Sequence, residues 1–314
     1  MLETRSYTQM RDDFCAEYKR SIVPAFLKFN KERSQKILIA NIVKTILIIL
    51  ATLFLYQTFT GIKNNSGNYI FPLILAMLSG ISIYSFNFLF AKNIEISIKK
   101  KVMPILCQLL GDLTWIDGKG GFAGTAIYKR SLLASNFDST KVDDIFVGKF
   151  DNIKVDILDT ELLKKQSNAQ IKVFAGSIIK LDIGKSFCGH TIIPFGANAT
   201  NRKHFASKLS SITLNETGFT KPIDIYTNAE DEAKKYITPK FIECIENIRR
   251  SFFAKQLTCI FYENCILIGL NAGSSLFETA SLTKSLNNSK KFFNVYERYL
   301  AIIKFIDYIK LTFK

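Results

Sequence analysis

The chain has 314 residues, a hydrophobic content of 48% and a formal net charge of +15. This length allows either a membrane segment with one sizeable core or two small domains. The six cysteines lack the C-x-x-C spacing of zinc sites, and they do not form the dense pattern of a disulfide-stapled domain. We therefore expect reduced thiols in a cytoplasmic compartment.

Residues 1–36 form the first expected region. Aromatic and aliphatic residues recur at helical spacing between charged ones, which predicts an amphipathic helix on the cytoplasmic side over residues 8–36. Pro24 should kink this helix. The apolar positions are Phe14, Tyr18, Ile22, Phe26 and Phe29.

Residues 37–91 predict a hairpin of two transmembrane helices, 37–59 and 69–91. The second run has no charged residue and exceeds the roughly 20 residues that cross a bilayer. The first contains Lys44, which is costly in the middle of a bilayer. The stem of Lys44 either reaches toward the near headgroups, or its ammonium group meets an acid in a transmembrane helix of another membrane protein.

Basic residues flank the hairpin and predict its orientation. The connecting loop, 60–68, contains only Lys63, whereas both outer ends are rich in lysine and arginine. By the positive-inside rule, we expect a two-pass protein of the cell membrane with both termini cytoplasmic. The flanking residues are Lys28, Lys31, Arg33 and Lys36 before the hairpin, and Lys92, Lys99, Lys100 and Lys101 after it.

The second lysine group is the predicted membrane-contact site. Anionic headgroups attract each lysine near the surface by about 1 kcal/mol. Nucleic acid is the competing partner for a basic chain, but no aromatic-interleaved basic stripe or known nucleic-acid motif occurs, so none is expected. The site comprises Lys92, Lys99, Lys100 and Lys101.

Residues 92–314 predict a cytoplasmic α+β domain with a mainly antiparallel sheet and helices, because strands and helices are segregated along the chain. A basic helix over 93–110, broken by Pro104, should precede it, and a helix over about 290–313 should close it. Between them we expect strands at 144–150, 153–158, 172–182, 191–195 and 221–226, a helix from about 229, a helix from Pro239 to about Phe253, and a last hairpin.

The last hairpin pairs Leu257–Tyr262 with Cys265–Leu270 around the turn Glu263-Asn264. In this register Tyr262 faces Cys265 and Cys259 faces Ile268, so the two sulfur atoms lie on opposite faces of the sheet. We expect no disulfide between them.

Motifs for catalysis or cofactor binding are weak. Gly118–Ala123 matches a dinucleotide fingerprint formally, but no strand is expected before it and no helix after it, so a flexible turn is predicted. Cys188 lies near His190 in the sequence, but neither His190 nor His204 has a third group at a diagnostic spacing, so each histidine is expected to be a packed strand residue or a turn residue. The acids 230–232 suit a solvated helix start. No cofactor or metal is expected, and no catalytic residue can be named.

Several segments together resemble a bacterial family of two-span membrane proteins whose domain has no known function. The resemblance implies a membrane-anchored architecture and no activity. Some members are encoded near LemA-type membrane proteins, which implies a membrane-protein partner. The segments are Phe14-x-x-x-Tyr18, Ile22-x-Pro24, Glu32-Arg33, Asp143-Asp144-Ile145-x-x-Gly148, Phe174-x-Gly176, Phe219-x-x-x-Ile223-x-Ile225-Tyr226, Ala233-x-x-Tyr236-Ile237-Thr238-Pro239-x-Phe241 and Leu276-Phe277-Glu278.

These observations favour a non-enzymatic binding or scaffold module at the cytoplasmic membrane surface. The alternative is a membrane-surface enzyme that acts on a lipid or an envelope precursor. A deep pocket lined by Asp143, Asp144, His190 or Glu278 would favour the enzyme.

Overall fold

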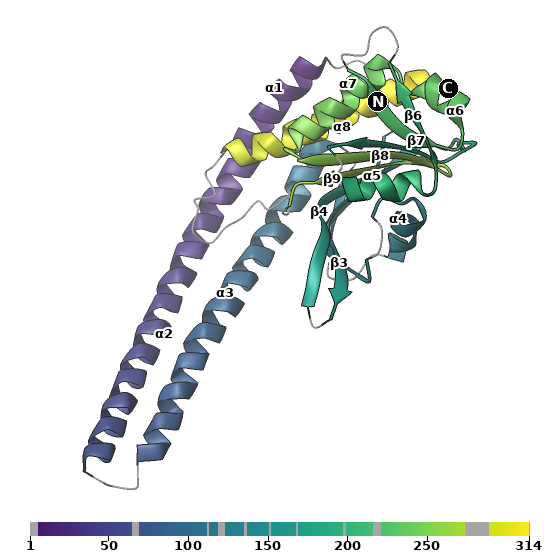
Figure 1. Cartoon of the computed structure of the whole chain (residues 1–314). Coiled ribbons are helices and arrows are strands. Elements are labelled where there is room, and N and C mark those ends of the chain that lie inside the picture. The colour runs from purple at the N-terminus through teal and green to yellow at the C-terminus, as the bar shows by residue number, and fades with distance from the viewer. Residues whose placement is uncertain are drawn as a thin grey trace. The chain divides into compact units, whose positions relative to one another are not determined.

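The computed structural model describes residues 6–64, 69–111, 113–118, 123–134, 137–150, 152–167, 169–196, 199–215, 221–273 and 289–313. These residues form two compact units (Figure 1). One unit is helical and is made of Thr8–Ile105. The other contains Tyr7 and the described residues of Leu106–Glu278 and Ser289–Lys314, and it mixes helices with a sheet.

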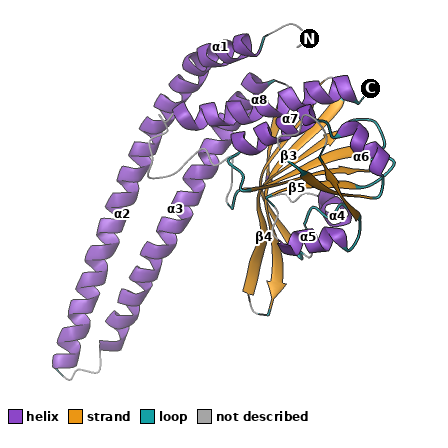
Figure 2. Cartoon of the chain, turned by 45° about the horizontal axis from the view of Figure 1, so that its top comes forward, coloured by secondary structure: helices purple, strands orange, loops and turns teal. Residues whose placement is uncertain are grey.

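The helical unit is built on α2 (Val23–Lys63) and α3 (Ile70–Leu110), each of 41 residues. They run antiparallel and side by side (Figures 1 and 2). Lys101 Nζ donates to Glu32 Oε2 at 2.9 Å and so joins the two helices. Both apolar runs of the sequence are therefore helical.

Pro24 and Pro104 differ in their effect on these helices. The segment before α2 is α1 (Tyr7–Glu17) followed by a π-helical turn, Tyr18–Ile22, and this turn contains Arg20, whose carbonyl lies four residues before Pro24 in the first turn of α2. Pro104 lies inside α3 without ending it, and the predicted break is wrong. Pro104 removes the bond to the carbonyl four residues earlier, and its ring crowds that carbonyl. That carbonyl belongs to the exposed Lys100 and can bond to water.

Large apolar side chains cover the outside of α2 and the first part of α3. Among the described residues one helix, Asn30–Lys63, is long and apolar enough to cross a membrane, and an 18-residue stretch of it has a mean hydropathy of 2.4. A shorter apolar helix covers Ile70–Ser85. Side chains that are at least half exposed include Leu38, Ile39, Ile42, Ile46, Leu53, Phe59, Phe71, Met77, Leu78 and Ile81.

The second unit contains an antiparallel sheet of nine strands in the order β1-β2-β3-β4-β9-β8-β5-β7-β6. Figure 2 shows the strands in orange. The strands are β1 (Leu113–Asp117), β2 (Ser139–Phe150), β3 (Ile153–Gln166), β4 (Ala169–Asp182), β5 (Thr191–Phe195), β6 (Ser210–Leu214), β7 (Ile223–Thr227), β8 (Gln256–Tyr262) and β9 (Cys265–Asn271). The mixed fold with a mainly antiparallel sheet is thus confirmed.

The register predicted for the last hairpin is confirmed. Tyr262 pairs with Cys265, and Cys259 pairs with Ile268. Both cysteines are free. Cys265 belongs to the apolar core on one face of the sheet. Cys259 shares the other face with Phe261, because residues two apart in a strand point the same way.

The sequence analysis missed two short strands and two short helices. β1 and β6 lie at the two edges of the sheet, where each pairs with one neighbour. The helices are α4 (Ala126–Arg130) and α5 (Ala199–Ala206). Five to eight residues with few apolar positions carry too weak a periodic pattern to identify, and tertiary contacts stabilise such elements.

One face of the sheet packs against α7 (Pro239–Ser251) and α8 (Ser289–Thr312), both close to their predicted bounds. Thr238 caps α7 by accepting a hydrogen bond from Phe241 N, and Pro239 occupies the first turn, as expected. Phe241 contacts Phe261 of the sheet and Phe305 of α8, with ring centroids 5.4 and 5.6 Å apart.

The other face carries a second apolar core beneath α4, α5 and the turn that follows α4. Apolar residues from six strands meet those of the helices there. The core includes Tyr128, Leu133, Phe137, Phe174, Ile178, Ile192, Phe205, Tyr226, Ile260 and Leu267. The sheet is therefore buried on both faces.

Gly176 is required by its backbone and by its neighbour. Its φ of +151° is a conformation that side chains disfavour, and a Cβ atom there would overlap with the Leu270 carbonyl oxygen. Gly184 has a φ of +67°, but no atom lies within 4 Å of its Cβ direction. A side chain at Gly176 would therefore meet both backbone strain and steric overlap, whereas one at Gly184 would meet backbone strain alone.

We expect Gly176→Ala to lower stability by more than about 2 kcal/mol and Gly184→Ala by about 1 kcal/mol, because only the first adds overlap to strain. The thermal unfolding midpoint of the full chain in detergent measures this difference. Equal shifts for the two variants would show that overlap at Gly176 is relieved without cost.

Candidate functional site

A row of polar residues crosses four strands on the sheet face that packs against α8. Asp117 of β1 pairs with Asp144 of β2, Asp144 pairs with Asp159 of β3, and Asp159 pairs with Ser177 of β4. Directly opposite residues of an antiparallel pair point to the same face, so these four side chains are neighbours. Asp144, Asp159 and Ser177 are at most 1% exposed.

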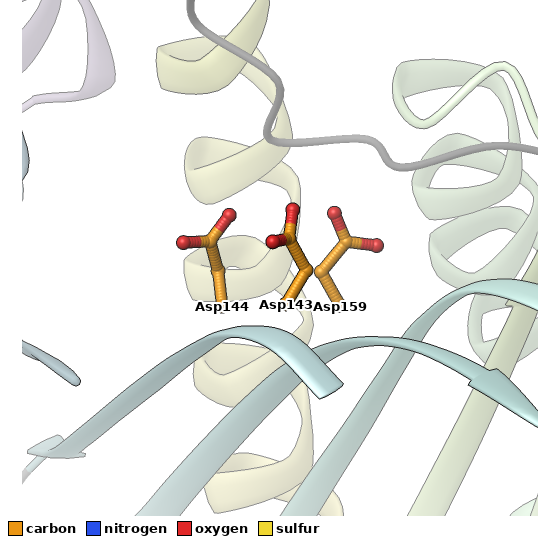
Figure 3. Close-up of side chains that lie close together, drawn as sticks. All are labelled: Asp143, Asp144 and Asp159. Carbon is orange, nitrogen blue, oxygen red and sulfur yellow. The ribbon is translucent and has the colours of Figure 1, made fainter. Parts of the chain in front are cut away.

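A β-bulge in β2 brings a third carboxylate to the row. The register shifts between Val142 and Asp144, so Asp143 is an extra residue in the ladder. Such a bulge turns a side chain away from the regular alternation of a strand. One carboxylate oxygen from each of Asp143, Asp144 and Asp159 lies within 4.8 Å of the others (Figure 3). Asp143 is exposed, whereas Asp144 and Asp159 are buried.

The side chains that interact with this carboxylate cluster, which comprises Asp143, Asp144 and Asp159, include Trp115 and Arg298. Trp115, the chain's one tryptophan, donates from Nε1 to Asp144 Oδ1 at 2.9 Å. Arg298 of α8 interacts electrostatically with Asp159. Burial lowers the pKa of Arg298, and the Asp159 charge opposes this effect.

Arg298 also fixes the position of α8. Its Nε donates to the Ser251 carbonyl oxygen at 3.3 Å, and its guanidinium lies 5.6 Å from the Phe252 ring centroid. The residue is 8% exposed, so an oriented charge is held close to the carboxylate cluster.

The cluster can hold a cation, because carboxylate oxygens are hard, anionic ligands. The sequence analysis considered Asp143 and Asp144 but missed Asp159. The signal was present: a hairpin turn at Asp151-Asn152 pairs Phe150 with Ile153, and counting back along both strands pairs Asp144 with Asp159. Asp151 itself lies outside the described residues.

The structure places His190 away from this cluster. Its Nε2–H donates to the Ser131 carbonyl oxygen at 3.0 Å, and its ring lies 4.9 Å from the Tyr262 ring centroid. These contacts give His190 the packing role expected from the sequence. His204 lies in α5, with its ring 6.3 Å from Phe205.

The loop before β5 is tied to α6 (Glu230–Tyr236) by side chains. The Glu232 carboxylate accepts hydrogen bonds from Cys188 N at 3.0 Å and Gly189 N at 3.2 Å. Asn228 Oδ1 accepts one from His190 N at 2.6 Å. The predicted start of a helix with acids in its first turn agrees with α6, in which Glu230 and Asp231 are exposed and the half-buried Glu232 also binds the loop before β5.

The glycine motif at Gly118 has a different context from the one expected. β1 ends directly before it, and α4 follows at Ala126, so the predicted absence of flanking elements is wrong. β1 is nevertheless an antiparallel edge strand, whereas a dinucleotide fold needs a parallel βαβ unit. Residues 119–122 lie outside the described part of the chain.

The described residues of the second unit form surface hollows on separate sides. A polar cleft of about 550 Å³ lies on the α5 side, and its lining includes Lys164, Phe174, Asn201 and Asn271. A groove of about 640 Å³ follows α7 and α8. Neither is lined by the residues that would favour an enzyme, Asp143, Asp144 and His190, and Glu278 lies outside the described residues.

The four lysines predicted to meet the membrane all lie in α3. Lys100 is exposed, Lys101 bonds to Glu32, and Lys99 is 5% exposed. The side chain of Lys92 lies outside the described residues. Lys100 and Lys101 thus offer the accessible charges of this group.

His190 should make stability depend on pH. Burial lowers its folded-state pKa below the ordinary 6.5, although the Ser131 carbonyl opposes this. The unfolded state therefore takes up the proton first as the pH falls below 6.5, and stability declines until the pH reaches the folded-state pKa. We expect His190→Gln to reduce this loss between pH 7 and 5, measured as the thermal unfolding midpoint. If the parent and His190→Gln lost the same thermal stability between pH 7 and 5, His190 would not be the cause of the pH dependence.

Comparison with known proteins gives one result for this unit. No curated protein and no solved structure matches the chain. Residues 172–311, from β4 to α8, match the model of a family described as "Protein of unknown function (DUF3137)". The match contains Ser177 and Arg298 but none of the three carboxylates. This part of the chain is therefore a domain of unknown function.

Proposed function

We propose that the chain is a membrane-anchored binding or scaffold module, held by a two-span hairpin, with both termini and the α+β domain on the cytoplasmic side. The apolar exterior of α2 and α3 is the observation that carries this proposal. The spans are residues 37–59 and 69–91.

The apolar exterior has a direct physical meaning. Soluble monomers rarely expose contiguous apolar patches larger than a few hundred Å², because such patches associate in water. Here apolar side chains at least half exposed recur along α2 from Leu38 to Ile62. They resume on α3 between Ile70 and Ile81. A bilayer removes this surface from water.

The orientation rests on the distribution of basic residues. Lysine and arginine concentrate before residue 37 and after residue 91, while the connecting loop has one lysine. Cytoplasmic flanks carry such an excess. Lys44 lies in the first third of its span, where its stem can extend to the cytoplasmic headgroups.

A binding role is supported by the hollows of the second unit. The groove along α7 and α8 and the polar cleft near α5 both have volumes that suit recognition of another molecule. Within the part of the chain that the structure describes, the carboxylate cluster has Trp115 and Arg298 among its partners. This arrangement supports binding better than catalysis.

Reporter fusions test the topology. We expect alkaline phosphatase, which is active only outside the membrane, to be active when inserted after Asn64 and inactive after Gly111. Deleting residues 69–91 should reverse the second result and show that the reporter responds. Phosphatase activity after Gly111 in the intact chain would overturn the orientation.

Affinity purification of the full chain from native membranes in a mild detergent tests the binding role. We expect a co-purifying membrane protein or enrichment of anionic lipids. Lys100→Glu should reduce the lipid enrichment, since each lysine near the headgroups contributes about 1 kcal/mol. The same change at exposed Lys203 of α5 should not. The proposal fails if neither proteins nor lipids exceed background.

A further inference from the structure

The spacing of the carboxylate cluster matches the coordination sphere of a hard cation. Oxygen ligands lie about 2.3–2.6 Å from Ca²⁺ and about 2.0–2.1 Å from Mg²⁺, so two ligands of one ion are separated by no more than about twice these lengths. The oxygens of Asp143, Asp144 and Asp159 lie within 4.8 Å of one another. One ion of the size of Ca²⁺ can therefore contact all three, and a smaller ion such as Mg²⁺ can do so once the carboxylate oxygens close to within about 4.2 Å of one another.

Ser177 supplies an independent indication of a ligand. Its side chain is fully buried, and its Oγ has no hydrogen-bond partner among the residues described. An unsatisfied buried hydroxyl costs about 1–3 kcal/mol. The pairing of Ser177 with Asp159 directs this hydroxyl to the face that bears the cluster. A hydrated ion would bring a water molecule to it.

The surroundings are organised as in a cation site that opens to solvent. Asp143 is exposed and gives an ion a path to the buried Asp144 and Asp159. Trp115 bonds to Asp144 Oδ1 and orients that carboxylate. Groups of this kind, which hold the ligands in place, raise the affinity of metal sites.

We propose that Asp143, Asp144 and Asp159 bind one hard divalent cation of the class Mg²⁺, Ca²⁺ and Mn²⁺, and that Ser177 Oγ bonds to a water molecule of this ion. The competing arrangement is a network of the carboxylates with Arg298 and no ion. The proposal is independent of the membrane topology and of the binding role proposed above.

Trp115 provides a probe inside the chain, since it is the one tryptophan and lies 2.9 Å from a carboxylate oxygen of the cluster. The full chain in detergent, stripped with a chelator, is titrated with MnCl₂. Because Mn²⁺ is paramagnetic, binding should quench the tryptophan fluorescence with saturation at one ion per chain. Excess Mg²⁺ or Ca²⁺ should restore the fluorescence.

Four variants locate the ion. Asp144→Asn keeps an acceptor for Trp115 but removes a charge, and it should abolish saturable quenching. Asp143→Asn changes an exposed residue, so it tests the site even if Asp144→Asn does not fold. Ser177→Ala should weaken Mn²⁺ binding by about tenfold, as for other residues that support metal ligands. Asp156→Asn is the matched control, on the opposite face of β3, and should bind like the parent.

Two results would overturn the proposal. The first is that Mn²⁺ leaves the fluorescence of the parent chain unchanged. This result is expected if the carboxylates form a network with Arg298 and bind no ion. The second is saturable quenching that persists in both Asp143→Asn and Asp144→Asn, which would place the ion elsewhere.

Discussion

Burial of the sheet on both faces is the constraint on which the second unit depends. The central strand β9 shows it most directly, because all six residues from Cys265 to Leu270 are buried. α7 and α8 pack against one face, and α4 and α5 pack against the other. Any polar side chain in the interior rows must therefore find a partner within the fold, since water does not reach it. This requirement applies to Asp144, Asp159 and Ser177, which are buried side by side in the sheet.

Elements that depend on residues close together in the sequence could be predicted, whereas elements that depend on contacts with distant segments could not. The Glu263-Asn264 hairpin and β5 follow from turn residues and short apolar runs, so their bounds were predicted closely. The start of α7 was predicted from Thr238-Pro239, because threonine caps helices and proline suits the first turn. β6, with the sequence Ser-Ser-Ile-Thr-Leu, exists because β7 pairs with it, and no window of five residues contains that information.

The site was harder to predict than the fold because its residues come from separate strands. Asp143 and Asp144 are visible in the sequence as a pair, but the bulge that lets both reach one cluster is a property of the ladder with β3. The role of Glu232 likewise depends on a loop that lies far earlier in the chain. Partners so distant leave no spacing pattern.

The family match and the carboxylate cluster overlap only in part. The matched segment begins in β4, and it supplies the hydroxyl of Ser177 and the guanidinium of Arg298. The acids and Trp115 come from β1, β2 and β3, which precede it. In this chain the neutral and cationic side of the row thus lies inside the matched segment, and the acidic side lies in the three strands before it.

Because of the bulge in β2, Asp143 supplies a carboxylate to the cluster without being needed for the pairing of β2 with β3. Val142 pairs with Thr160 and Asp144 pairs with Asp159, so every backbone pair on either side is complete without Asp143. A one-codon deletion in a related gene would leave the ladder in register and remove one carboxylate. The sheet does not require a residue at this point. An acid kept here in relatives would thus indicate selection for the carboxylate cluster.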